Sequence, residues 1–330
     1  MDHLAPPGPG AGLPAAGPPP PVGQARAWLM AVRPRTLSAS LAPVAVGTAL
    51  AVAQGGFHGG AALAALLGAL LIQVGTNLAN DVLDFQKGAD TAERLGPTRV
   101  VASGLLSARA VSLGAAAAFG AALLVGLYLV SRGGLPILVI GLASLACGYL
   151  YTGGPHPLAY RGLGDLFVLV FFGLIAVAGT VYVQTGRWSP AALLLGLSVG
   201  ALSVAILSAN NLRDRATDAA AGKRTLIVRL GDGWGRRYFA FTVGLAFALP
   251  ALMVLLGLWR PGSGGSLGPR VLLLLLALPL ARAPLARVRA GAAGRELLPV
   301  LGQTARLQLW HAALLCTGLL WEAWSGRGGG

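Results

Sequence analysis

Charged residues are scarce in this chain of 330 residues. Asp, Glu, Lys and Arg together make up 11% of it, whereas an ordinary soluble domain carries about 25%. Hydrophobic residues account for 55%, and the mean hydropathy is +0.71. This composition excludes a soluble globular enzyme and is typical of an integral membrane protein.

Cysteine and clustered histidine are also lacking. The two cysteines, Cys147 and Cys316, each lie in an apolar run without a CxxC or Cys/His spacing, so neither a disulfide framework nor a zinc site is indicated. His58, His156 and His311 each stand alone, and we interpret them as structural.

The positive charge has a distribution that argues against nucleic-acid binding. The formal net charge is +14, with 25 Lys and Arg residues. A nucleic-acid-binding protein would gather these on one face or helix, but here they lie mainly in alternate loops between apolar runs. Such alternation orients a multi-pass membrane protein.

The apolar runs are long enough to cross a bilayer. A helix needs roughly 20 apolar residues to span a hydrocarbon core of about 30 Å. Because the runs are continuous and do not alternate with polar residues, they predict helices and exclude a barrel. The nine predicted segments are 37–57, 60–80, 107–131, 134–152, 164–185, 190–211, 238–259, 269–288 and 306–324.

The basic residues predict the orientation of this bundle. With nine segments, all but five of the Lys and Arg residues fall on one side, the exceptions being Arg132, Arg187, Arg260, Arg270 and Arg327. Basic loops stay in the cytoplasm. We therefore expect an inner (plasma) membrane protein with a cytoplasmic N-terminus and an outside C-terminus.

The segments outside the bundle are short. Residues 1–25 hold eight of the 21 prolines and no aromatic residue, a composition that cannot bury enough surface to offset the entropy of ordering. We expect a disordered tail there, a transmembrane domain over 26–324 and a flexible tail over 325–330.

Acidic residues gather at two places on the expected cytoplasmic side. Seven of the eleven acids fall within 81–93 or 214–232. Asn77, Asp81 and Asp84 follow an i, i+4, i+7 spacing, which predicts one helix face. The second stretch repeats this with Asn210, Asp214 and Asp218 at i, i+4, i+8.

Carboxylates stacked on one helix face repel each other unless a cation neutralises them. Carboxylate and amide oxygens without His or Cys favour a hard cation, and Mg²⁺ typically binds one or two carboxylates together with substrate phosphate oxygens. Arg213, Lys223 and Arg224 are interleaved with the acids and supply the positive charge that a phosphate needs. The pattern indicates a diphosphate substrate.

At this level of detail the chain resembles the UbiA superfamily of membrane prenyltransferases. The resemblance covers roughly residues 26–324. It rests on RPRT (33–36), NLANDVLDFQKGAD (77–90), RLGPTRVVASG (94–104), YLYTGG (149–154), GLGDLFVLVFFG (162–173), NNLRDRATDAAAGKRTL (210–226) and LPVLGQTARLQL (298–309).

The resemblance implies an all-α bundle of nine transmembrane helices and Mg²⁺-dependent transfer of a polyprenyl chain from an allylic diphosphate to an aromatic acid. The third acid of the first motif stands at Asp90, after Gly88, a spacing similar to that of the menaquinone branch. That branch transfers the chain to 1,4-dihydroxy-2-naphthoate with loss of CO₂ and diphosphate.

The implied site residues combine both motifs. Mg²⁺ ligands are expected at Asp81, Asp84, Asp90, Asp214 and Asp218. Contacts to the diphosphate are expected from Asn77, Asn80, Lys87, Arg99, Asn210, Asn211, Arg213, Lys223 and Arg224.

Aromatic and flanking polar residues complete the candidates. An allylic carbocation needs an electron-rich wall, which Tyr149 and Tyr151 could supply through cation–π attraction or, alternatively, they belong to an interfacial aromatic belt. Arg33 and Arg35 could bind a phosphate or the acceptor carboxylate, but such arginines are more often topology anchors. Asp165 could orient a neighbour or cap a helix.

Two other interpretations stay open. Another aromatic acceptor, such as 4-hydroxybenzoate or homogentisate, would use the same donor site. A secondary transporter would place its acids near the bilayer midplane, whereas these cluster at one side. The expected partners are the two substrates and membrane lipid; the motifs specify neither chain length nor oligomeric state.

Overall fold

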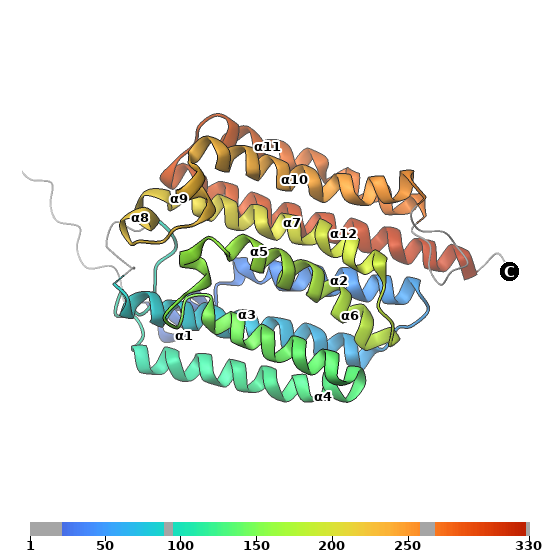
Figure 1. Cartoon of the computed structure of the whole chain (residues 1–330), viewed down its shortest axis with the longest axis horizontal. Coiled ribbons are helices and arrows are strands. Elements are labelled where there is room, and N and C mark those ends of the chain that lie inside the picture. The colour runs from blue at the N-terminus through green and yellow to red at the C-terminus, as the bar shows by residue number, and fades with distance from the viewer. Residues whose placement is uncertain (1–21, 89–94, 258–267, 328–330) are drawn as a thin grey trace, which may run out of the picture.

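The computed structural model describes residues 22–88, 95–257 and 268–327, and every regular element within them is helical (Figure 1). The elements are α1 (Gln24–Val32), η1 (Pro34–Thr36), α2 (Ser38–Ala53), α3 (Gly59–Gln86), α4 (Ala108–Leu150), η2 (Leu158–Arg161), α5 (Gly164–Leu169), η3 (Val170–Ile175), α6 (Ala176–Thr185), α7 (Pro190–Arg213), α8 (Arg215–Ala220), α9 (Leu226–Leu230), α10 (Asp232–Leu255), η4 (Pro269–Ala277), α11 (Leu278–Arg289), η5 (Gly294–Leu297) and α12 (Leu298–Arg327).

The long helices lie side by side in one bundle. In Figure 1, α10 and α11 form one edge, α3 and α4 form the other, and α7 and α12 lie between them. Helix α7 packs against α10, α12 and η3 and is the most buried of the candidate spans. The largest hydrophobic cluster of the described residues is built mainly from α2, α6, α7, α10 and α12.

Helix α4 reverses direction within its length. Gly134 has φ 63° and ψ −152°, a conformation open to glycine but not to other residues. Near the start of α4, Val111 packs in one cluster with Leu78 of α3, and just after its end the Thr152 hydroxyl donates to Asn80 of α3. Both ends of α4 therefore adjoin the same part of α3.

Length and hydropathy identify six described helices able to cross a membrane, or seven if the pair α1–η1 and α2, bent by 51°, is one span. The six are α3, α4, α5–η3–α6, α7, α10 and η4–α11. Helix α12, with polar side chains such as Gln308 and His311, is not among them, and α4 is counted once. The all-helical membrane bundle is confirmed, whereas nine crossings stay a prediction.

Close glycine contacts bring α5–η3–α6 against α7. A Cβ added to Gly173, in the π-helical turn η3, would lie 2.6 Å from the Gly196 carbonyl oxygen and 2.8 Å from the Gly200 Cα. Membrane helices use small residues to approach in this way. This contact holds α5–η3–α6 against α7.

The predicted tails are only partly described. Residues 1–21 and 328–330 lie outside the described ranges, and α1 begins at Gln24. Helix α12 runs to Arg327, beyond the predicted boundary at residue 324.

Candidate functional site

A polar cavity of about 480 Å³ lies where η1, α3, α5, α7 and the segments following α3 and α7 meet. Both predicted motifs contribute side chains to it. The predicted residues in its lining are Asn77, Asn80, Asp84, Arg99, Tyr151, Asn210, Asn211, Arg213, Asp214, Asp218 and Lys223.

Asp84, near the end of α3, joins the two motifs. It is 3% exposed, and its Oδ2 is 2.6 Å from Arg99 Nη2. Its Oδ1 is 3.4 Å from the ammonium of Lys223, which follows α8. One carboxylate thus pairs with a cation from each motif region, so the two sequence stretches form one site.

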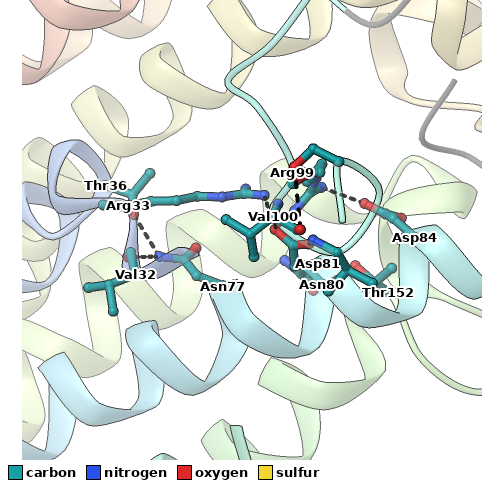
Figure 2. A network of polar contacts seen from close by, with 12 residues as sticks. Val32, Arg33, Thr36, Asn77, Asn80, Asp81, Asp84, Arg99, Val100 and Thr152 are labelled. Atoms are coloured by element: carbon teal, nitrogen blue, oxygen red, sulfur yellow. Dashed lines mark hydrogen bonds and ion pairs between the residues drawn. The ribbon is translucent and has the colours of Figure 1, made fainter. Parts of the chain in front are cut away.

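Asp81 does not line the cavity. It is 1% exposed, and its carboxylate accepts hydrogen bonds from the backbone N–H groups of Val100 (3.4 Å) and Val101 (3.1 Å). Its Oδ2 also lies 3.9 Å from Arg33 and 4.0 Å from Arg99 (Figure 2). Asp81 therefore holds the turn that carries Arg99.

Three of the predicted residues of α3, Asn77, Asn80 and Asp84, line the cavity. Asn80 and Asp84 are four residues apart and share the face that lines the cavity, whereas Asp81 is rotated by about 100° from Asn80. Asp81 as a Mg²⁺ ligand stays a prediction. Asn77 does line the cavity, so the face is Asn77, Asn80 and Asp84.

Asn77 ties the chain before α2 to α3. Its Nδ2 donates to the Val32 carbonyl and to Thr36 Oγ1, both at 2.9 Å, and its Oδ1 accepts from Gln73 (Figure 2). These bonds fix the turn at Arg33, whose φ of 56° is rare outside glycine. Through these hydrogen bonds Asn77 helps to shape the cavity, and its contact with a diphosphate stays a prediction.

The end of α7 supplies the second cluster. Arg213 is 4% exposed and forms a bidentate pair with Asp214, with N–O distances of 2.7 and 2.5 Å. The Arg213 Nη1 has no hydrogen-bond partner within the described residues. Because Arg213 lines the cavity, this nitrogen is a donor available to a bound anion.

Two predicted cations lie outside the cavity lining. The Lys87 ammonium donates to the Thr152 carbonyl and lies 5.1 Å from the Tyr160 ring centre, with the Lys223 ammonium over the same ring at 5.1 Å. Partial desolvation lowers the pKa of Lys87, Asp84 opposes this shift, and Lys223 adds to it. The exposed Arg224 bonds Tyr160 through its backbone N–H.

Only one of the two predicted tyrosines contributes to the cavity. Tyr149 is 48% exposed and absent from the lining, whereas Tyr151 lines it. Residues two apart at a helix end point to different sides, so both could not face one cavity. Asp90 lies outside the described residues.

An apolar cavity of about 230 Å³ adjoins the polar one. It lies among α3, α4, η3 and α6 and is lined almost entirely by apolar side chains. Thr76, Tyr151, Val168 and Phe172 line both cavities. Tyr151 therefore stands at the junction between a polar and an apolar compartment.

Some lining residues were not predicted as site residues. Thr98 and Thr152 line the polar cavity, and nothing in their local sequence distinguishes them from other loop threonines. Arg33 and Asp165 also line it; the sequence considered both, but juxtamembrane arginines and helix-capping acids are common in membrane proteins.

The oxygen-rich lining fits a hard cation bound together with an anion. Within the described ranges, no three His, Cys, Asp or Glu side chains are grouped so as to hold a metal ion alone. Asp84 and Asp214 pair with cations instead. Mg²⁺ needs only one or two carboxylates when phosphate oxygens complete its coordination, and Asp84, Asp214 and Asp218 are part of this lining.

The sequence of this chain is similar to those of known enzymes. Residues 40–293 match the UbiA prenyltransferase family. The 1,4-dihydroxy-2-naphthoate octaprenyltransferase of Mycobacterium tuberculosis is 38% identical over 87% of this chain and 94% of its own. The enzyme of the same name from Escherichia coli is 39% identical over 66% of this chain and 73% of its own.

Solved structures share the fold at low identity. A UbiA homologue from Aeropyrum pernix has a TM-score of 0.64 and 16% identity, covering 85% of this chain and 97% of its own. A UbiA homologue from Archaeoglobus fulgidus bound to DMAPP and Mg²⁺ has a TM-score of 0.61 and 16% identity, covering 87% and 98%.

Proposed function

Because the chain belongs to the UbiA prenyltransferase family, we propose that it transfers a polyprenyl chain from an allylic polyprenyl diphosphate to 1,4-dihydroxy-2-naphthoate, with loss of CO₂ and diphosphate. The product would be demethylmenaquinone in its reduced form. The observation that carries this proposal is the pairing of Asp84 with both Arg99 and Lys223 in one cavity. The names of relatives that cover most of the chain support the acceptor.

The cations of the cavity would bind the donor diphosphate. Arg99, Arg213 and Lys223 line it, and Nη1 of Arg213, which has no partner among the described residues, can donate a hydrogen bond to an anion. Asp84, Asp214 and Asp218 would hold Mg²⁺ together with the diphosphate. When bound, Mg²⁺ would neutralise the negative charge that develops on the diphosphate as it leaves. Arg99, Arg213 and Lys223 would then exchange some of their contacts with carboxylates for contacts with the phosphate oxygens.

The transfer needs charge stabilisation and exclusion of water. The bond between C1 of the prenyl chain and the diphosphate oxygen breaks, and its electron pair leaves with the diphosphate held by Arg99 and Arg213. The ring carbon of the acceptor that bears the carboxylate forms the bond to C1. The acceptor carboxylate leaves as CO₂, and its bonding pair restores the aromatic ring.

Tyr151 and the apolar cavity would receive the prenyl chain. The Tyr151 ring borders both cavities, where its face can stabilise positive charge on the allylic carbon. The adjoining apolar cavity is lined in part by Phe167 and Phe171 and suits an isoprenoid tail, and its mainly apolar lining would keep water from the carbocation.

The proposal includes nine membrane crossings. They are the bent pair α1–η1–α2, α3, the two legs of α4, α5–η3–α6, α7, α10, η4–α11 and α12. The reversal at Gly134 supports two crossings in α4. The basic loops favour a cytoplasmic N-terminus and cavity and an outside C-terminus. Cysteine labelling tests this: Arg132→Cys should react with an impermeant reagent only from outside the cell.

Product analysis tests the reaction. The purified protein in lipid vesicles receives Mg²⁺, a mixture of prenyl diphosphates and equal amounts of 1,4-dihydroxy-2-naphthoate, 4-hydroxybenzoate and homogentisate. We expect mass spectrometry to detect only the decarboxylated prenyl naphthoquinol or its quinone. Prenylated 4-hydroxybenzoate or homogentisate as the main product would contradict the proposal.

Two variants serve as the controls. Asp84→Asn removes a buried carboxylate paired with two cations and should abolish product formation. Asp232→Asn changes a side chain that is 40% exposed and that pairs with Arg236 of its own helix, so the activity of this variant should match that of the unaltered protein.

A further inference from the structure

Asp165 is a buried acid that lines the polar cavity. It is the second residue of α5 and is 4% exposed. Its Oδ1 has no hydrogen-bond partner, and no Lys or Arg pairs with it among the residues that the structure describes. A buried polar atom without a partner costs free energy, so this oxygen indicates a ligand contact.

The position of Asp165 places it at the junction of the two cavities. Val168 and Phe172, three and seven residues further on, line both the polar and the apolar cavity. A Cβ added to the preceding Gly164 would lie 3.1 Å from the Tyr151 hydroxyl oxygen. Tyr151 and Asp165 both line the polar cavity, so the two side chains border the same space.

The surroundings of Asp165 restrict what it can bind. A phosphate would be repelled by a carboxylate without a neighbouring cation. The acids proposed to hold Mg²⁺ include Asp84 and Asp214, which pair with cations, whereas Asp165 pairs with none among the described residues. The group that fits against this oxygen is an uncharged hydroxyl donor.

We propose that Asp165 accepts a hydrogen bond from a ring hydroxyl of the aromatic acceptor. The assignment rests on the proposed function, because a dihydroxynaphthoate brings such hydroxyls to the place where the prenyl carbon lies. A hydrogen bond to a carboxylate strengthens electron release from the hydroxyl oxygen into the ring, and the proton stays on that oxygen throughout. Asp165 thus orients the ring and raises its nucleophilicity.

Substrate analogues test this contact directly. The kcat/KM of the unaltered protein is measured with 1,4-dihydroxy-2-naphthoate and with the two analogues that lack either the 1-hydroxyl or the 4-hydroxyl. Removing the contacted hydroxyl should lower kcat/KM by about 10- to 100-fold, because the carboxylate then loses its partner. In Asp165→Leu, which has no acceptor atom, the same removal should lower kcat/KM by about 10-fold less than in the unaltered protein, because only the hydroxyl's own electron release into the ring is then lost.

A second variant, Asp165→Asn, distinguishes the proposed contact from a folding defect and from a purely structural role. This variant keeps the shape and one acceptor oxygen, so it should retain part of the discrimination. A helix-capping role predicts that both variants lower the melting temperature and weaken binding of the prenyl diphosphate. The contact proposed here predicts unchanged donor affinity, measured without acceptor, in both.

The outcomes separate this assignment from the proposed function. Full discrimination between hydroxylated and dehydroxylated acceptors in Asp165→Leu would overturn the contact while leaving the reaction in place. Weakened donor binding in Asp165→Asn would also overturn it. Absence of any prenylated product with the unaltered protein would overturn the proposed function, and the Asp165 assignment with it.

Discussion

The different roles of Asp81 and Asp84 lead to a prediction about magnesium dependence. Both acids belong to the first motif, but Asp84 lines the cavity and Asp81 bonds the backbone N–H groups of Val100 and Val101. Asp81→Asn and Asp84→Asn each remove one negative charge from nearly the same place in the chain. They should nevertheless alter different properties.

The magnitude for Asp81→Asn follows from its contacts. Asparagine keeps one acceptor oxygen, so the change removes one charge-assisted hydrogen bond, worth about 1.5–3 kcal/mol. The ion pairs to Arg33 and Arg99, at 3.9 and 4.0 Å, are long and contribute less. A loss of this size should lower the melting temperature by several degrees and loosen the turn that carries Arg99.

Two assays separate the roles: thermal unfolding in detergent, and titration of prenyl transfer with Mg²⁺. Asp81→Asn should lower stability and kcat while leaving the Mg²⁺ concentration for half-maximal activity within about 3-fold. Asp84→Asn should raise that concentration by at least about 10-fold or abolish turnover. An equal rise in Asp81→Asn, without loss of stability, would refute the positions assigned to these two acids.

Three further predictions concern the cavity walls. Tyr151→Ala should lower kcat by about 10-fold or more through loss of cation–π stabilisation, whereas Tyr149→Ala, at an exposed position, should change it by less than about 3-fold; steady-state kinetics decides this. Gly173→Leu should reduce the yield of folded protein in size-exclusion chromatography, because even a Cβ there would lie 2.6 Å from the Gly196 carbonyl. Normal yield would contradict the close helix contact. Arg213→Lys keeps the charge but loses the bidentate geometry, so the KM for the prenyl diphosphate should rise by about 10-fold. An unchanged KM would mean that Arg213 pairs with Asp214 and does not contact the diphosphate.

The architecture could be predicted from the sequence because apolar run length and loop charge act over many residues. The paired helical segments around Gly134 were separable in the sequence, although the structure joins them in the single element α4. Hydropathy identifies α12 least well as a membrane span, because its polar residues Gln308 and His311 are fully buried. Polar residues packed inside a bundle lower hydropathy without changing the helix.

The site was predictable as a region but not in detail. Helical spacing shows which residues share a face, but the rotation of α3 depends on its packing against α1 and on the loop that follows, which bonds Asp81. Lys87 and Arg224 were included because they adjoin the acids in sequence, yet both lie outside the cavity lining. Asp165 needed the structure, since only burial distinguishes it from a helix cap.

A structure of the protein with Mg²⁺ and a non-hydrolysable prenyl thiodiphosphate tests the central claim most directly. We expect the diphosphate group in the polar cavity, within hydrogen-bond distance of Arg99 and Arg213, with Asp84 and one acid of the Asp214–Asp218 pair at the metal. The prenyl chain should pass Tyr151 into the apolar cavity. A diphosphate bound elsewhere, or bound by only one of the two motifs, would contradict the account.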